Sequence, residues 1–150
     1  MNFRELERAV SETIRQGEIG IPVALRLNCQ FGDRSVDVIE GAIMALHLAE
    51  TAFAEDRPAR LHARRTSDGR QLTVLASYRL GQTFFLTTTA IDGVRESLDL
   101  LLVGNHGIVR LEGGELFVPE SADGSFSDPG GWKSAIERSL REQGAVEFAS

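Results

Sequence analysis

Two short segments of the sequence carry side chains that could bind a ligand or transfer a proton. In the first, Glu40 and His47 lie seven residues apart on the polar stripe of an otherwise apolar predicted helix. Two helical turns separate them by about 10.5 Å along the axis, which is too far for a direct hydrogen bond. The stripe is either the polar edge of a buried helix or a surface that faces a ligand cleft or a partner subunit.

The second segment alternates basic side chains along a predicted strand. Arg60, His62 and Arg64 are spaced by two residues, which directs them to one face. Such a row could hold a carboxylate or a phosphate, and it equally suits a solvated or interface strand. His106 lies in a Gly-Asn-His-Gly run, where we expect a tight turn. We predict no metal site and no serine hydrolysis, because neither a metal-ligand spacing nor a G-x-S-x-G motif is present.

Hydrophobic periodicity predicts the elements that position these groups. Residues 2–16 and 35–54 have apolar side chains at helical spacing, and residues 22–30 alternate as a strand does. Glycine turns divide the region after the second helix into strands, and a Ser/Asp/Gly-rich loop at 120–131 precedes a closing helix from Trp132 to Gly144. The strands after the second helix read ARLHARRT, QLTVLASYRL, TFFLTTTAI, SLDLLLVG, GIVRLE and ELFV.

These elements predict an α+β fold with an open, largely antiparallel sheet of about six or seven strands and helices on one face. The short turns make a meander the simplest topology. Alternation directs an almost entirely apolar set to the helices: Leu72, Val74, Ala76, Tyr78, Phe84, Leu86, Leu98, Leu100 and Leu102. The opposite face mixes apolar side chains with threonines, a pattern that marks an interface. We therefore predict sheet-to-sheet association through Leu75, Phe85, Thr87, Leu101 and Val103.

The composition of the 150 residues, 42% hydrophobic and 25% charged, is ordinary for one globular domain. A net charge of −6 argues against nucleic acid as a partner. No apolar run reaches the roughly 20 residues of a membrane span and the first residues form no signal core, so we expect a cytoplasmic protein. Cys29 is the only cysteine, which excludes an internal disulfide and indicates a structural role.

Two stretches of the chain carry a resemblance to a known family. QGEIGIPVALR, at residues 16–26, resembles the start of the C-terminal domain of the glucose-fructose oxidoreductase, inositol dehydrogenase and MocA family. LDLLLVGNHGIVRLEGGELFV, at residues 98–118, resembles the final strands of that domain, and PARLHA at 58–63 and the turn at Gly81 fit it too. The resemblance covers roughly residues 3–145. It implies one domain, equivalent to the substrate and oligomerisation half of such an enzyme.

In that family an N-terminal Rossmann domain binds the nicotinamide cofactor at a glycine-rich turn and carries a catalytic lysine. The glycines of this chain lack the G-x-G-x-x-G spacing, and its only lysine is Lys133, in the closing helix. The family's histidine and aspartate belong to a G-x-H-x-x-D motif. Alignment on Gly41 places Ile43 and Leu46 there, and neither can transfer a proton. His47 is one residue away, which on a helix rotates its side chain by roughly 100°.

The leading hypothesis is a non-catalytic or partner-dependent oxidoreductase-like domain that forms a homo-oligomer, such as a dimer, through its sheet. No cofactor is expected on this chain alone, and NAD(P) is expected only if a partner supplies a Rossmann domain. One alternative is the substrate-side subunit of a split NAD(P)-dependent sugar or polyol dehydrogenase, with a separate Rossmann-domain subunit. Another is a stand-alone protein that binds a small sugar or acid, with Glu40, His47, Arg60, His62 and Arg64 as candidate ligand-binding residues.

Overall fold

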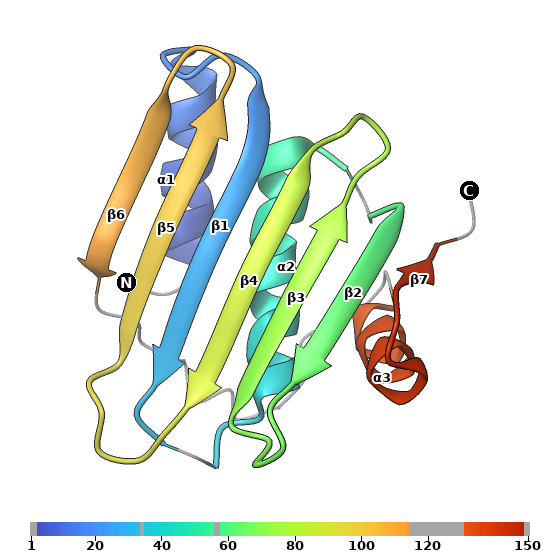
Figure 1. Ribbon diagram of the computed structural model, residues 1–150. Coiled ribbons are helices and arrows are strands. Elements are labelled where there is room, and N and C mark those ends of the chain that lie inside the picture. Colours follow the sequence, from blue (N-terminus) through green and yellow to red (C-terminus); the bar gives the residue numbers. More distant parts are fainter. Residues whose placement is uncertain (1–2, 34, 56–57, 115–130, 149–150) are drawn as a thin grey trace.

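The computed structural model describes residues 3–33, 35–55, 58–114 and 131–148. These residues form three helices and seven strands (Figure 1). In chain order the elements are α1 (Phe3–Arg15), β1 (Pro22–Phe31), α2 (Val38–Phe53), β2 (Arg60–Arg65), β3 (Gln71–Ser77), β4 (Thr83–Ala90), β5 (Ser97–Gly104), β6 (Ile108–Gly114), α3 (Trp132–Glu142) and β7 (Val146–Glu147). The predicted strand ELFV at 115–118 and the loop at 120–130 lie outside the described residues. None of the described helices is long and apolar enough to cross a membrane.

The strands form one sheet in the order β6-β5-β1-β4-β3-β2-β7. β1 is parallel to β4, and every other neighbouring pair is antiparallel. The predicted α+β class is confirmed, but the predicted meander is wrong, because β1 lies between β4 and β5. β1 buries Leu25, Leu27 and Cys29 almost completely, and a central position pairs both of its hydrogen-bonding edges. Turn residues predict which consecutive strands form a hairpin. They do not predict that a strand from earlier in the chain, here β1, lies between two later strands.

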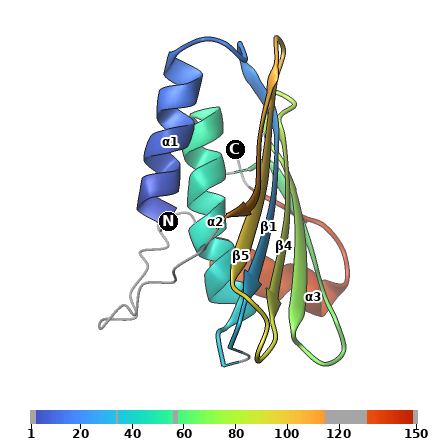
Figure 2. The same ribbon diagram turned by 90° about the vertical axis from the view of Figure 1, so that its left-hand side faces the viewer.

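Helix α2 packs along the middle of the sheet and forms most of the core with it (Figure 2). It begins at Val38 rather than at the predicted residue 35, because the Asp37 carboxylate caps it by accepting a hydrogen bond from the Ile39 amide at 2.9 Å. Gly41 allows the helix to approach the sheet, since a Cβ at this position would lie 2.8 Å from a ring carbon of Phe31. The buried Thr88 hydroxyl donates to the Val38 carbonyl at 3.0 Å and joins β4 to the helix start.

Helices α1 and α3 complete the helical layer around α2. α1 buries Phe3, Leu6 and Val10, the apolar spacing that predicted it. α3 lies beside the β2 edge of the sheet (Figure 1) and buries Trp132 completely. The indole nitrogen of Trp132 donates to a Glu50 carboxylate oxygen of α2 at 2.7 Å. The short strand β7, which the sequence did not predict, then pairs with β2.

Candidate functional site

The face of the sheet opposite α1 and α2 is the candidate functional site. Leu75 and Phe85 are 48% and 38% exposed there, whereas Val74 and Leu86 on the helical side are fully buried. The alternation therefore assigns the two faces as predicted. Among the described residues no helix covers the middle of this open face (Figure 2). The predicted interface residues that share it are Leu75, Phe85, Thr87, Leu101 and Val103.

The strand register lines up apolar and basic side chains in one row across the open face, which we call the central row. Leu75 pairs with Phe85, Phe85 with Arg26, and Arg26 with Leu101. The guanidinium carbon of Arg26 lies 5.9 Å from the centroid of the Phe85 ring, a cation–π contact. The row continues to His62 on β2 and to Arg110 on β6. It thus crosses six strands and brings their apolar and basic side chains into one row.

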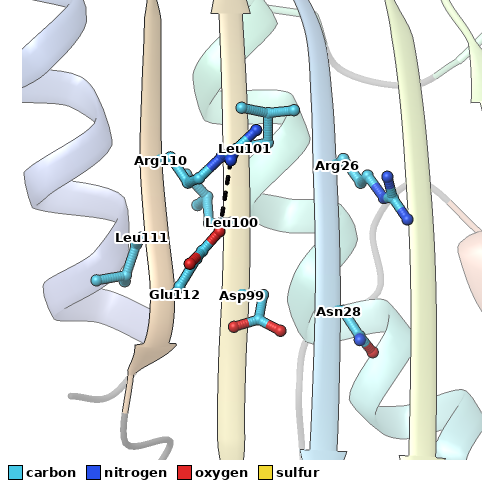
Figure 3. Close-up of a pocket in the computed structure, with 8 residues that line it drawn as sticks. All are labelled: Arg26, Asn28, Asp99, Leu100, Leu101, Arg110, Leu111 and Glu112. Carbon is cyan, nitrogen blue, oxygen red and sulfur yellow. Dashed lines mark hydrogen bonds and ion pairs between the residues drawn. The ribbon is translucent and has the colours of Figure 1, made fainter.

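A depression of about 400 Å³ lies on the same face over β1, β5 and β6 (Figure 3). Arg110 and Glu112, both on β6, form an exposed ion pair at 3.5 Å beside it. Two guanidinium groups, two carboxylates and one amide supply donors and acceptors of both charges. Such a set matches hydroxyl-rich molecules or a protein surface of mixed charge better than a purely anionic ligand. The lining residues are Arg26, Asn28, Asp99, Leu100, Leu101, Arg110, Leu111 and Glu112.

The predicted polar stripe of α2 is occupied by contacts with neighbouring side chains. Glu40 pairs with Lys133 of α3 at 3.0 Å. Nδ1 of His47 lies 3.2 Å from Glu50, the same carboxylate that accepts from the Trp132 indole. Both candidate residues therefore contribute to the packing of α3 against α2.

The basic row of β2 lies on the other side of the sheet from this stripe. Arg60, His62 and Arg64 point toward the open face, while Leu61 and Ala63 between them are buried toward the helices. Nε2 of His62 is buried and makes no hydrogen bond within the described residues. The sheet thus separates the two predicted groups, which do not form one site.

The turn that contains His106 has a structural role. The His106 backbone amide donates to the Ile19 carbonyl at 2.9 Å, and the Asn105 side chain accepts from the Ile21 amide at 2.8 Å. The turn packs against Gly20 so closely that a Cβ there would lie 2.0 Å from the Asn105 side-chain oxygen. The predicted tight turn is confirmed, and it anchors the β5–β6 hairpin to the start of β1.

The sequence interpretation missed the group of charges around the depression. Alternation already placed Arg26 and Asn28 on the polar face of β1, and Asp99 between buried Leu98 and Leu100 on β5. The missing information was strand order, because a meander keeps β1 away from β5. In the structure Asn28 and Asp99 are direct cross-strand partners.

The positions expected for an acid–base pair are buried. Ile43 and Leu46 are 1% and 0% exposed in the core, so an alternative register of α2 that exposed them would break the packing. Burial also raises the pKa of the Cys29 thiol well above its ordinary value of 9.0, with a smaller contribution from the Asp99 charge. Cys29 is therefore a protonated core residue. Among the described residues no group of three His, Cys, Asp or Glu side chains could hold a metal ion.

The connection between β1 and α2 does not fit the pyrophosphate of a nicotinamide dinucleotide. The β1–α2 connection runs from a strand into a helix, the arrangement that such a site requires. This connection contains a single glycine, Gly32, and the Asp37 carboxylate already caps the helix start. That negative charge would repel a pyrophosphate at the position where the family fingerprint places one.

No family model and no curated protein matches the sequence. Solved structures match it instead, with TM-scores of 0.76 for scyllo-inositol dehydrogenase from Lactobacillus casei and 0.72 for myo-inositol 2-dehydrogenase from Lactobacillus plantarum, both at 11% identity. The fold is that of a dehydrogenase C-terminal domain. A myo-inositol dehydrogenase from Corynebacterium glutamicum matches at 12% identity and a TM-score of 0.70.

These matches cover 99%, 95% and 96% of this chain, but 64%, 61% and 61% of the respective dehydrogenase chains. The L. casei structure contains NAD(H) and scyllo-inositol. This chain thus spans less than two thirds of the length of these dehydrogenases. The resemblance inferred from residues 16–26 and 98–118 is supported at the level of the fold.

Proposed function

We propose that this chain is an oxidoreductase-like domain that self-associates face to face through its open sheet and does not transfer hydride by itself. The observation that carries the proposal is the central row, in which Leu75 pairs directly with Phe85, and Arg26 lies between Phe85 and Leu101. Stacked sheets pack at about 10 Å and bury such bands between them. An isologous dimer uses the same patch on both copies.

The charge pattern of the open face favours a second copy as the occupant. A symmetric interface must be complementary to itself, and this face carries both signs: Arg26 and Arg110 lie near Asp99 and Glu112. A second copy of this chain supplies a surface of the same mixed charge. A two-fold axis that sets Arg26 and Arg110 of one copy opposite Asp99 and Glu112 of the other would pair the two faces.

The expected strength of the association follows from the exposed apolar area. Full burial of a leucine or phenylalanine side chain is worth about 1.5–3 kcal/mol, so the exposed parts of Leu75 and Phe85 correspond to about 1 kcal/mol each. Burial on both copies doubles this free energy. The total by itself does not exceed the free-energy cost of association. We therefore expect a concentration-dependent dimer that also needs the threonines and charges of the face.

The proposal that the domain is not independently catalytic rests on its own residues. Ile43 and Leu46 cannot act as acid or base, and the β1–α2 turn does not fit a pyrophosphate. Hydride transfer would require NAD(P) held by a Rossmann domain elsewhere, for example on a separate subunit. Nicotinamide-dependent oxidation of a polyol by the purified chain alone would contradict this part of the proposal.

A substitution in the centre of the open face tests self-association. In Phe85→Glu a carboxylate replaces the ring that stacks on Arg26, and a buried charge opposes pairing of the faces. Leu80→Glu is the matched control, because Leu80 is 74% exposed in the β3–β4 turn, away from the face. Sedimentation equilibrium from about 5 to 500 μM should show wild type and Leu80→Glu approaching twice the monomer mass, and Phe85→Glu remaining monomeric. A monomeric wild type at the highest concentration would refute the proposal.

A second candidate function, binding of a small hydroxyl-rich ligand, is favoured by the depression beside the central row. Arginine and carboxylate groups in one hollow can donate to and accept from the same hydroxyls. A thermal-shift screen with cyclitols, sugars and sugar acids tests it on wild type and Asn28→Ala. Stabilisation lost in the variant supports ligand binding, and no stabilisation by any compound excludes it for this hollow.

A further inference from the structure

We propose that Arg65 at the end of β2 and Arg141 in the last turn of α3 bind a phosphate group. A hollow of about 460 Å³ lies where this strand end meets the last turn of α3. Its volume falls within the range of small-molecule sites. None of its lining residues is acidic: they are Ala63, Arg64, Arg65, Leu140, Arg141 and Gln143.

The arginines come from two elements that are firmly joined. Arg64 and Arg65 are consecutive at the end of β2, and Arg141 belongs to the last turn of α3. The Ser139 hydroxyl accepts a hydrogen bond from the Ala63 amide at 2.9 Å and ties the two elements together next to the hollow. Arg65 and Arg141 therefore border one space between the strand and the helix before any ligand arrives, which lowers the entropic cost of binding. The side chain of Arg64 points toward the open face instead.

The ion pairing of these arginines differs from that of other surface arginines. Arg110 and Arg138 pair with Glu112 and Glu142 at 3.5 and 3.3 Å. Within the described part of the chain, no carboxylate forms an ion pair with Arg64, Arg65 or Arg141.

Arg65 has one further contact, since its Nε donates to the Gly69 carbonyl at 3.3 Å. A guanidinium group has five N–H donors, so this bond leaves most of them for a ligand.

The chemistry of the site selects a compact oxyanion. Arg65 and Arg141 bring two positive charges to one hollow in a chain whose net charge is −6. A phosphate dianion offsets both charges, and its tetrahedral oxygens match the forked donors of two arginines at once. A free phosphate and a sugar phosphate present the same group to the arginines.

The proposed site is independent of self-association through the open face. Arg65 is the partner of Leu72, which points toward the helices, and Arg141 lies on α3. Substitution of Arg65 or Arg141 therefore leaves the central row unchanged. A monomeric protein could bind phosphate here, and a dimer could lack this affinity.

Calorimetric titration of the full chain with inorganic phosphate, at ionic strength held constant with chloride, tests the site. We expect saturable binding of one phosphate per chain, weakened about tenfold by Arg141→Gln, the loss expected for one charge-assisted hydrogen bond. Arg65→Gln is the second variant, in case Arg141→Gln alters α3. Arg79→Gln, which removes the same charge from the exposed β3–β4 turn, is the control and should bind as wild type does.

A parallel titration with glucose 6-phosphate identifies the source of the phosphate group. Tighter binding than that of inorganic phosphate, lost in Arg141→Gln, supports a sugar phosphate, and weaker binding supports the free ion. The proposal is overturned if phosphate does not bind above the chloride background. It is also overturned if Arg79→Gln weakens binding as much as Arg141→Gln and Arg65→Gln, since that result indicates only diffuse attraction.

Discussion

Replacement of Ser139 by alanine should destabilise the domain more than any exposed serine substitution in the same helix. The Ser139 side chain is fully buried and lies between α3 and the β2 edge. Its hydroxyl accepts from the Ala63 amide at 2.9 Å and donates to the Gly144 carbonyl at 2.6 Å. Alanine leaves the amide buried without a partner, which costs about 1–3 kcal/mol, and removes a second bond worth about 1 kcal/mol. We expect a total loss of about 3 kcal/mol.

Urea unfolding followed by circular dichroism measures this loss for Ser139→Ala. Ser134→Ala is the matched control, because Ser134 is exposed on the same helix and the variant removes the same hydroxyl. It should change stability by less than about 0.5 kcal/mol. In thermal unfolding, Ser139→Ala should lower the midpoint by about 6–12 °C in a domain of this size. Equal stability of the two variants would refute the idea that Ser139 holds α3 against the sheet.

Two further predictions concern the β1 entrance and the core. Gly20→Ala should destabilise the domain by about 2 kcal/mol, because alanine is strained at a φ of +74° and its Cβ would also collide with the Asn105 side chain. Gly17→Ala is the control, because Gly17 has a similar φ of +79° but open space around it, so that only the strain applies. Burial raises the pKa values of Cys29 and Tyr78 above their ordinary values of 9.0 and 10.0. As the pH rises, both groups therefore ionise in the unfolded chain before they ionise in the folded one. The stability present at neutral pH is lost as the pH rises above about 9. Urea unfolding from pH 7 to 11 should show a fall in the free energy of unfolding of the wild type and a smaller fall in Tyr78→Phe. The same dependence on pH in both proteins would contradict the contribution assigned to Tyr78.

The predictions from local pattern succeeded where a short stretch of chain contains its own signal. The spacing of Phe3, Leu6 and Val10 predicted α1 to within one residue at each end, and the run after Asp37 predicted a nearly all-apolar α2. The two faces of β3 and β4 were also assigned correctly, because side chains of a strand alternate regardless of which strands lie beside it.

The candidate site was predicted less completely, since it depends on contacts between distant segments. The apolar members of the open face were found because each stands out within its own strand. The charged neighbours of those residues were not, because Arg26 reaches Phe85 and Leu101 only through the central insertion of β1. Similarly, Arg65 was not predicted as a site residue, whereas both Arg65 and Arg141 line the hollow at the end of β2.

The sequence by itself determined the class of fold, the two semi-apolar faces of the strands and the absence of proton-transfer groups at Ile43 and Leu46. These properties follow from periodicity and residue type, which act over a few residues. Tertiary structure alone decided the strand order and, with it, which charges gather around the open face. Strand order depends on pairing between segments as far apart as Arg26 and Leu101. That pairing satisfies both hydrogen-bonding edges of β1 and buries its apolar face against the helices.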